Sequence, residues 1–273
     1  MKLLILQHVR VEHPGIFRSF LQEDGHDWVS VQLDEGESPP SLKGFDALWV
    51  MGGPMDVWEE DSYPWLRDEK RLIQEAVEER GMPFLGLCLG HQLLAEALGG
   101  KCGKAERSEI GIMSVQLTEI GADGIIFDDF PDQFSCLQWH GAEIEQMPSG
   151  ATCLATSPDC AVQAMAWGPR AYSTQFHLEV EPDTVANWMD IPVYRSSLVA
   201  ALGEAWSRAG EVSGRAALTV LPGLRFNSAG GPMTIDAESH HSTLNLVIAR
   251  GGREGLQVVK RLGPVDANAG CLV

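Results

Sequence analysis

Short apolar runs alternate with amphipathic helical patterns over residues 2–98, and this alternation limits the possible folds more than any other feature. The strand-like runs are KLLILQHV (2–9), WVSVQL (28–33), DALWVMGGP (46–54) and MPFLGLC (82–88). The helical patterns are GIFRSFLQEDG (15–25) and YPWLRDEKRLIQEAVEERG (63–81), and a glycine closes each of them. Such β–α alternation predicts a mostly parallel central sheet with helices on both faces.

Shorter strand-like runs follow Gly100 and predict a change in the sheet. Examples are IGIMSVQLTEI (110–120), FSCLQWHGAEI (134–144) and AYSTQFHLEV (171–180). They indicate a mixed or antiparallel extension of the same sheet, so the expected fold class is α/β. Ligands of open parallel sheets bind beyond the carboxyl ends of the strands. The glycine turns MGGP (51–54) and GLCLGH (86–91) occupy such ends and are candidate site segments.

Charge and cysteine spacing argue against several classes of function. The chain carries a formal charge of -18 at pH 7 and has a pI near 4.7, so neither nucleic acid nor an anionic membrane surface is an expected partner. No run approaches the roughly 20 apolar residues of a membrane span. The 6 cysteines form no C-x-x-C pair, and no metal is expected. The N-terminal run is typical of a strand, not of an export signal, so a cytoplasmic location with free thiols is expected.

The composition changes near residue 210. Residues 211–273 hold 6 Lys+Arg and 5 Asp+Glu, a net charge of +1, and contain none of the 8 Trp. We therefore expect one domain over residues 1–210 and a C-terminal tail of uncertain structure over residues 211–273.

The stretch FLGLCLGHQLLAEALGG (84–100) places Cys88 where a strand becomes a helix. A Gly-x-Cys-x-Gly turn at such a junction is typical of a nucleophile elbow, because Gly86 and Gly90 leave room for a tight turn. The helix expected over residues 89–98 directs its positive dipole end and free N–H groups at the sulfur. That environment stabilises the thiolate, which is the reactive form of cysteine.

A nucleophilic thiol needs a base, and His177 in AYSTQFHLEV is the best candidate among the 8 histidines. If this run is a strand, alternation puts Ser173, Gln175, His177 and Glu179 on one face. A carboxylate at Glu179 would fix the imidazole tautomer and stabilise the imidazolium. His91 has no evident carboxylate partner and is interpreted as structural, whereas His140 is expected to help shape the pocket without acting as the base.

Four segments together resemble the class I glutamine amidotransferases, including the glutaminase domain of GMP synthase. They are MGGPM, GLCLGHQLLAEALGG, QWHGAEI and STQFHLEVEP, and the resemblance covers about residues 1–195. It implies a flavodoxin-like fold and a Cys88–His177–Glu179 triad that hydrolyses the side-chain amide of glutamine through a thioester. The start LQHVRVEHPG is similar to the stand-alone, GMP-synthase-like members of the family.

The resemblance also implies roles for residues around the triad. Backbone N–H groups of Gly53 and Leu89 would form the oxyanion hole. Gln92 and the backbone of Trp139, Gly141 and Ala142 would bind the glutamine. Many family members have Gly-Pro-Gly where this chain has Gly53-Pro54-Met55, so Met55 is expected to alter the glutamine pocket.

Three alternatives compete with a glutamine amidotransferase. An α/β-hydrolase would have the chain order nucleophile, acid, His, and here the order is Cys, His, Glu. A hydrolase of γ-glutamyl conjugates on the same scaffold stays open, and so does a non-catalytic glutamine-binding module, which the complete triad disfavours. GGKCGK (99–104) is too short for a phosphate-binding loop. No cofactor is expected, and any synthetase that accepts the ammonia would be a separate chain.

Overall fold

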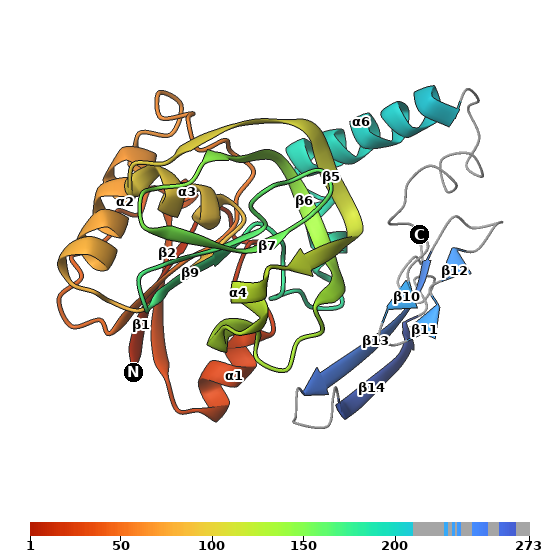
Figure 1. Ribbon diagram of the computed structural model, residues 1–273, viewed down its shortest axis with the longest axis horizontal. Helices are drawn as coiled ribbons and strands as arrows, with labels where there is room; N and C mark the ends of the chain where they lie inside the picture. The colour runs from red at the N-terminus through yellow and green to blue at the C-terminus, as the bar shows by residue number, and fades with distance from the viewer. Residues whose placement is uncertain (210–226, 229–230, 233, 236–241, 251–256, 266–273) are drawn as a thin grey trace.

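The computed structural model describes residues 1–209, 227–228, 231–232, 234–235, 242–250 and 257–265. Its main feature is a nine-stranded sheet in the order β2-β1-β3-β4-β9-β8-β7-β5-β6, with helices packed around it (Figure 1). At its centre β4 (Phe84–Leu87) pairs with β9 (Ala171–Thr174), although the two strands lie far apart in the sequence. Cys88 follows the first of these strands and His177 lies just beyond the second.

One half of the sheet is parallel, as the β–α alternation predicts. It consists of β1 (Lys2–Gln7), β2 (Asp27–Gln32), β3 (Ala47–Val50), β4 and β9. Successive residues of β1 point to opposite faces. Leu4 and Leu6 belong to the core cluster that contains the helical residues Leu66 and Leu93. Leu3 and Ile5 pack in a second cluster with Leu21, so the prediction of helices on both faces is confirmed.

Three helices cover this parallel half. They are α1 (Phe17–Glu23) on one face, and α2 (Trp65–Gln74) and α3 (Leu89–Ala97) on the other. The helix predicted over residues 63–81 ends in a π-helical turn at Glu75–Glu79, in which the Arg80 N–H reaches the Glu75 carbonyl at 3.0 Å. The two helices α2 and α3 pack on each other and support the turn that follows β3.

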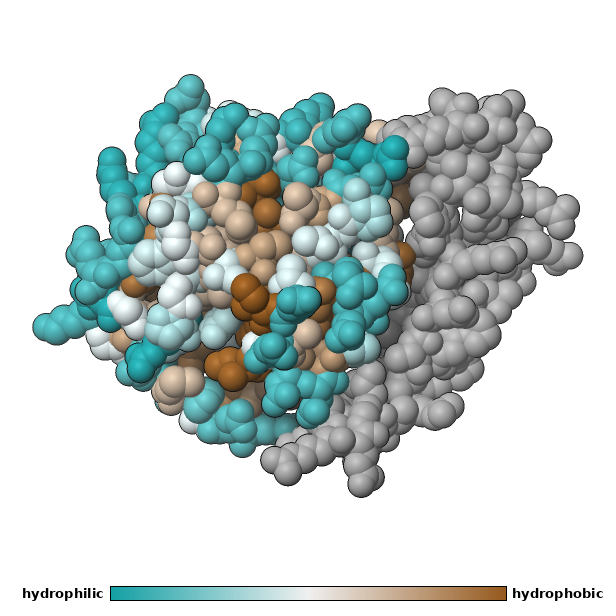
Figure 2. Space-filling model, viewed as in Figure 1, coloured by the Kyte–Doolittle hydropathy of each residue, from teal (hydrophilic) through white to brown (hydrophobic). Residues whose placement is uncertain are grey.

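The other half of the sheet is antiparallel, as expected for the extension. It contains β5 (Lys101–Leu117), β6 (Gln133–Gln146), β7 (Ala151–Thr156) and β8 (Ala164–Trp167). Two short elements connect β5 to β6, namely α4 (Glu119–Ala122) and η3 (Ile125–Phe127). Large apolar side chains gather at the surface here (Figure 2), and the exposed residues Ile120, Ile125, Ile126 and Phe130 belong to this connection.

The strand predicted over residues 171–180 is too long. Strand β9 ends at Thr174, and the chain then turns so that the Thr174 hydroxyl donates to the Phe176 carbonyl at 2.8 Å. The next backbone N–H groups find partners on other segments: Gln175 N–H bonds the Gln163 carbonyl at 2.8 Å and His177 N–H bonds the Leu137 carbonyl at 2.9 Å. These tertiary bonds replace the continued β4–β9 ladder.

Two helices follow the sheet, α5 (Thr184–Trp188) and α6 (Pro192–Ala209). Most of the predicted tail lies outside the described residues. Its described strands are β10 (Asn227–Ser228), β11 (Gly231–Pro232), β12 (Thr234–Ile235), β13 (Ser242–Arg250) and β14 (Gln257–Val265), which pair with one another in two further small sheets. In the part of the chain that the structure describes, no helix combines the length and the apolar character needed to span a membrane.

Candidate active site

Cys88 occupies the strained turn that its flanking glycines predict. It lies between β4 and α3 with φ 51° and ψ -102°, a conformation that L side chains rarely adopt. A Cβ on Gly86 would lie 2.5 Å from the Gly90 carbonyl oxygen, and a Cβ on Gly90 would come even closer to the Val50 carbonyl oxygen. Only glycine fits either position, and the expected strand–turn–helix around Cys88 is confirmed.

His177 and Glu179 meet directly, although not as neighbours on a strand. The His177 Nδ1–H donates to Glu179 Oε1 at 2.8 Å, and both side chains are buried. The Trp188 ring packs against the imidazole in a T-shaped arrangement, with ring centroids 4.7 Å apart. The bond to Glu179 leaves Nε2 as the ring nitrogen available for proton transfer.

The charge of His177 is controlled by its neighbours. Burial alone would lower the pKa of this imidazole, but the Glu179 carboxylate and the Cys88 sulfur raise its pKa well above the usual value. The raised pKa therefore favours a cationic His177 beside the Cys88 sulfur. This is the arrangement that activates cysteine nucleophiles.

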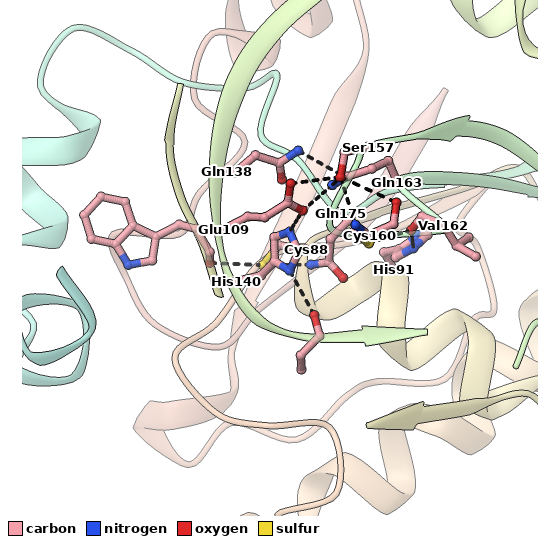
Figure 3. Close-up of polar contacts among 12 residues, drawn as sticks. Cys88, His91, Glu109, Gln138, His140, Ser157, Cys160, Val162, Gln163 and Gln175 are labelled. Atoms are coloured by element: carbon pink, nitrogen blue, oxygen red, sulfur yellow. Dashed lines mark hydrogen bonds and ion pairs between the residues drawn. The ribbon is translucent and has the colours of Figure 1, made fainter. Parts of the chain in front are cut away.

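One side-chain amide adjoins the sulfur and a second amide supports it, and Figure 3 shows the first, Gln175, close to Cys88. The Gln175 Nε2 group donates to Cys88 Sγ at 3.6 Å. Gln92 Nε2 in turn lies 3.1 Å from Gln175 Oε1 and 3.4 Å from the Ala142 carbonyl. Because a carbonyl can only accept, the Ala142 contact fixes the orientation of both amides. Sequence reasoning placed Gln175 on the same face as His177 but gave it no role.

The Gly53 turn lies beside the first residue of α3. A Cβ on Gly53 would come 2.9 Å from Leu89 Cδ2 and 2.8 Å from Met55 Sδ. Within the described residues, the N–H groups of Gly53 and Leu89 make no hydrogen bond. Met55 is buried in the main core cluster together with Leu89, so its side chain supports the turn from the interior.

A buried ion pair holds the preceding peptide unit. His8 Nδ1 donates to the Gly52 carbonyl at 2.8 Å, and His8 Nε2 lies 3.0 Å from Glu69 Oε1. Burial lowers the pKa of His8, but the Glu69 carboxylate outweighs it and the net pKa is raised. Both ring nitrogens face hydrogen-bond acceptors, so a protonated His8, with an N–H on each nitrogen, donates to both of them. Since the Gly52 carbonyl and the Gly53 N–H belong to one peptide unit, this pair fixes the direction of that N–H group.

The predicted substrate-binding residues Trp139, Gly141 and Ala142 lie on β6. The β5–β6 register pairs Ala142 with Lys104 and His140 with Glu109, so a bulge in β5 interrupts the ladder opposite Gly141. The Trp139 carbonyl lies 4.0 Å from Cys88 Sγ, which brings this strand to the thiol. The bulge leaves the backbone at Gly141 outside the regular pairing of the two strands.

His140 belongs to a buried polar cluster behind this segment (Figure 3). Its Nδ1 donates to the Ala142 carbonyl at 3.0 Å, and its Nε2 lies 3.0 Å from Glu109 Oε2. The Ser157 hydroxyl and the Gln163 amide donate to the Glu109 carboxylate at 2.8 and 2.6 Å, whereas His140 Nε2 lies near it without a hydrogen bond. The cluster anchors β6 near the thiol.

The same cluster offers donor types that a metal ion could use. A carboxylate oxygen of Glu109, a ring nitrogen of His140 and the sulfur of Cys160 lie within 4.8 Å of one another. Burial, however, raises the pKa of the Cys160 thiol to about 12, and metal binding would have to displace that proton. The sequence could not reveal this group because its members come from three separate segments.

His91 is close to the elbow but is committed elsewhere. Its Nδ1 lies 2.8 Å from the Ser173 hydroxyl and its Nε2 donates to the Val162 carbonyl at 3.1 Å. Burial lowers the pKa of His91 to about 3, so the ring stays neutral. These contacts agree with a structural role for His91.

Known proteins share both the sequence pattern and this fold. The family described as glutamine amidotransferase class-I matches residues 21–188. YfeJ of Salmonella typhimurium, a glutamine amidotransferase-like protein, is 32% identical over 189 residues, covering 68% of this chain and 78% of the relative. One subunit of the glutamine-hydrolysing GMP synthase of Sulfolobus acidocaldarius is 32% identical over 153 residues, covering 56% and 77%. Gamma-glutamyl peptidase 5 of Arabidopsis thaliana is 27% identical over 181 residues, covering 64% and 71%.

A solved structure supports the same assignment. The crystal structure of a glutamine amidotransferase from Thermotoga maritima aligns with a TM-score of 0.64 and 28% identity, covering 81% of this chain and 88% of that one. The fold expected from the sequence, a flavodoxin-like sheet of the amidotransferase type, is confirmed by this likeness and by the strand order. The chain therefore belongs to the class I glutamine amidotransferase family.

Proposed function

We propose that this protein is a glutaminase of the amidotransferase type, with Cys88 as nucleophile, His177 as general acid and base, and Glu179 as the group that orients His177. The observation that carries the proposal is the buried His177–Glu179 pair, bonded at 2.8 Å and adjoining an elbow cysteine. A purely structural cysteine would need neither the strained turn nor a cationic neighbour.

In the first half of the reaction the Cys88 thiolate attacks the side-chain carboxamide carbon of glutamine. A tetrahedral oxyanion forms, and we assign its stabilisation to the N–H groups of Gly53 and Leu89. The C–N bond then breaks, and the His177 imidazolium gives its proton to the departing ammonia. The product on the enzyme is a γ-glutamyl thioester of Cys88.

In the second half water attacks the thioester while neutral His177 takes its proton. The C–S bond breaks, glutamate leaves, and the Cys88 thiolate and the His177 imidazolium are restored. Throughout, Glu179 keeps Nδ1 protonated so that Nε2 performs both transfers. The Gln175 amide donates to the sulfur, which stabilises the thiolate between turnovers.

Binding of the free amino acid is assigned to the β6 edge. Gln92 and the backbone of Trp139, Gly141 and Ala142 hold the α-amino and α-carboxyl groups. The Ala142 carbonyl already accepts from His140 and Gln92, so we assign the substrate contact to the other backbone groups of this segment. The ammonia passes to an acceptor site on a separate synthetase chain, and similarity to one chain of a GMP synthase supports this arrangement.

A second function has one specific observation in its favour. The similarity to gamma-glutamyl peptidase 5 extends over 181 residues, and such a hydrolase would use the same thioester chemistry on a γ-glutamyl conjugate. In that case the protein would act alone, with no acceptor chain.

The choice between these functions is expected to show in the substrate preference of the purified protein. We expect slow hydrolysis of glutamine and no γ-glutamyl conjugate that is preferred strongly, because an amidotransferase without its synthetase gains nothing from wasting glutamine. The measurement is kcat/KM for glutamine and for a series of γ-glutamyl amines and peptides. A conjugate preferred by about a hundredfold, or roughly 2.7 kcal/mol of transition-state binding, would instead establish the conjugate hydrolase.

A further inference from the structure

An additional acid, Glu12, is buried against the proposed triad, and the reaction described above does not use it. It lies in the segment LQHVRVEHPG after β1 and is 2% exposed. A carboxylate oxygen of Glu12, a ring nitrogen of His177 and a carboxylate oxygen of Glu179 all lie within 4.8 Å of one another. A Cβ on Gly52 would come 2.6 Å from Glu12 Oε2, so the same carboxyl group touches the turn that carries Gly53.

The Glu12 carboxyl is held at one oxygen and unpartnered at the other. The Tyr194 hydroxyl of α6 donates to Glu12 Oε1. Glu12 Oε2 and Glu179 Oε2 are both buried without a hydrogen-bond partner among the described residues. Two buried, unpartnered carboxylate oxygens in one small volume are costly unless a proton lies between them.

The groups around Glu12 favour that proton. Burial raises its pKa, Glu179 raises it further, and the opposing effects of His177, Tyr194 and His8 do not cancel this, so the net pKa is raised. Among the described groups that act on it most strongly, none is a lysine or an arginine. Glu179 already has the His177 Nδ1–H as donor at its Oε1, which leaves Oε2 to accept a second hydrogen bond.

We propose that Glu12 is a positioning residue of this site: its neutral carboxyl group donates a hydrogen bond to Glu179 Oε2 and holds that carboxylate against His177, while Tyr194 holds Glu12. The proposal rests on the function proposed above and adds a side chain that supports the Cys88–His177–Glu179 triad. It also links α6 to the triad, because Tyr194 belongs to that helix.

The test compares Glu12→Gln with Glu12→Leu. A glutamine side chain can donate an N–H to Glu179 and accept a hydrogen bond from Tyr194, so Glu12→Gln should keep kcat within about threefold of the wild type. A leucine side chain can do neither. Glu12→Leu should therefore lower kcat by tenfold or more, with little change in KM. As pH rises, the wild type should lose activity when Glu12 ionises beside Glu179, and Glu12→Gln should lack that alkaline loss. Thermal melts confirm that each variant is folded.

A second readout does not depend on turnover. The His177 Nδ1 proton, bonded to a carboxylate, should give a downfield proton resonance in the wild type and in Glu12→Gln, and it should move or broaden in folded Glu12→Leu. An unchanged resonance in Glu12→Leu, or inactive Glu12→Gln with active Glu12→Leu, would overturn the role of Glu12. Absence of glutamine turnover in every variant with the resonance behaving as expected would count against the glutaminase proposal alone.

Discussion

Replacing Cys88 by alanine is expected to reduce glutamate release by roughly 10⁴-fold or more, because the thioester cannot form without the thiolate. Alanine tolerates the φ of 51° as well as cysteine does, so the fold should persist. The measurement is the steady-state rate of glutamate production, with a thermal melt to establish that the variant is folded.

The matched control is Cys153→Ala. Cys153 is half-buried, free, and has a pKa raised by burial, so its removal should leave the rate within about twofold of the wild type. Substantial glutamate release by folded Cys88→Ala, with loss in Cys153→Ala, would show that the nucleophile had been assigned to the wrong thiol.

Replacing His177 by asparagine is expected to lower kcat by roughly 10²–10⁴-fold, the usual contribution of a general acid and base. His91→Asn should stay within about tenfold of the wild type, because the asparagine amide can replace the Nδ1 contact with the Ser173 hydroxyl. The neutral His91 ring already commits its Nε2–H to the Val162 carbonyl, so it is not expected to serve as the base. The kinetics of the two variants are compared at the same pH after thermal melts.

Comparing these two histidines is a stringent test of which one is the base, because both are buried and both lie close to the elbow. If folded His91→Asn were the slower enzyme, the base would have been misidentified. Equal losses with equal destabilisation would indicate that both variants act through packing, and would contradict a special role for His177.

The fold was predictable where the sequence signal was local. The apolar run of β1 and the helices that alternate with the strands predicted a parallel sheet covered on both faces. In the structure Leu4 and Leu3 pack into core clusters on opposite faces of the sheet. The elbow was also predictable, since the Gly-x-Cys-x-Gly pattern that marks it lies within five residues of sequence, although the contact that requires glycine at Gly90 is with the Val50 carbonyl of β3. Each of these inferences needs only residues that are near in sequence.

Features that depend on distant contacts were missed or misjudged. The strand expected over residues 171–180 stops at Thr174 because Gln175 and His177 bond segments that the periodicity of their own stretch cannot reveal. The His8–Glu69 pair and the Tyr194–Glu12 contact join segments far apart in the chain. A buried carboxyl in a glycine-containing loop is indistinguishable from an exposed polar residue until the fold encloses it.

The most direct test of the central claim is the position of a covalent label. A diazoketone analogue of glutamine should alkylate Cys88, with the sulfur displacing dinitrogen to leave a stable thioether, and excess glutamine should slow the labelling. Peptide mapping by mass spectrometry should find one adduct, on Cys88, since burial raises the pKa of the thiols of Cys102, Cys136 and Cys160. An adduct on another cysteine, or an enzyme that hydrolyses glutamine at full rate after labelling elsewhere, would contradict the account.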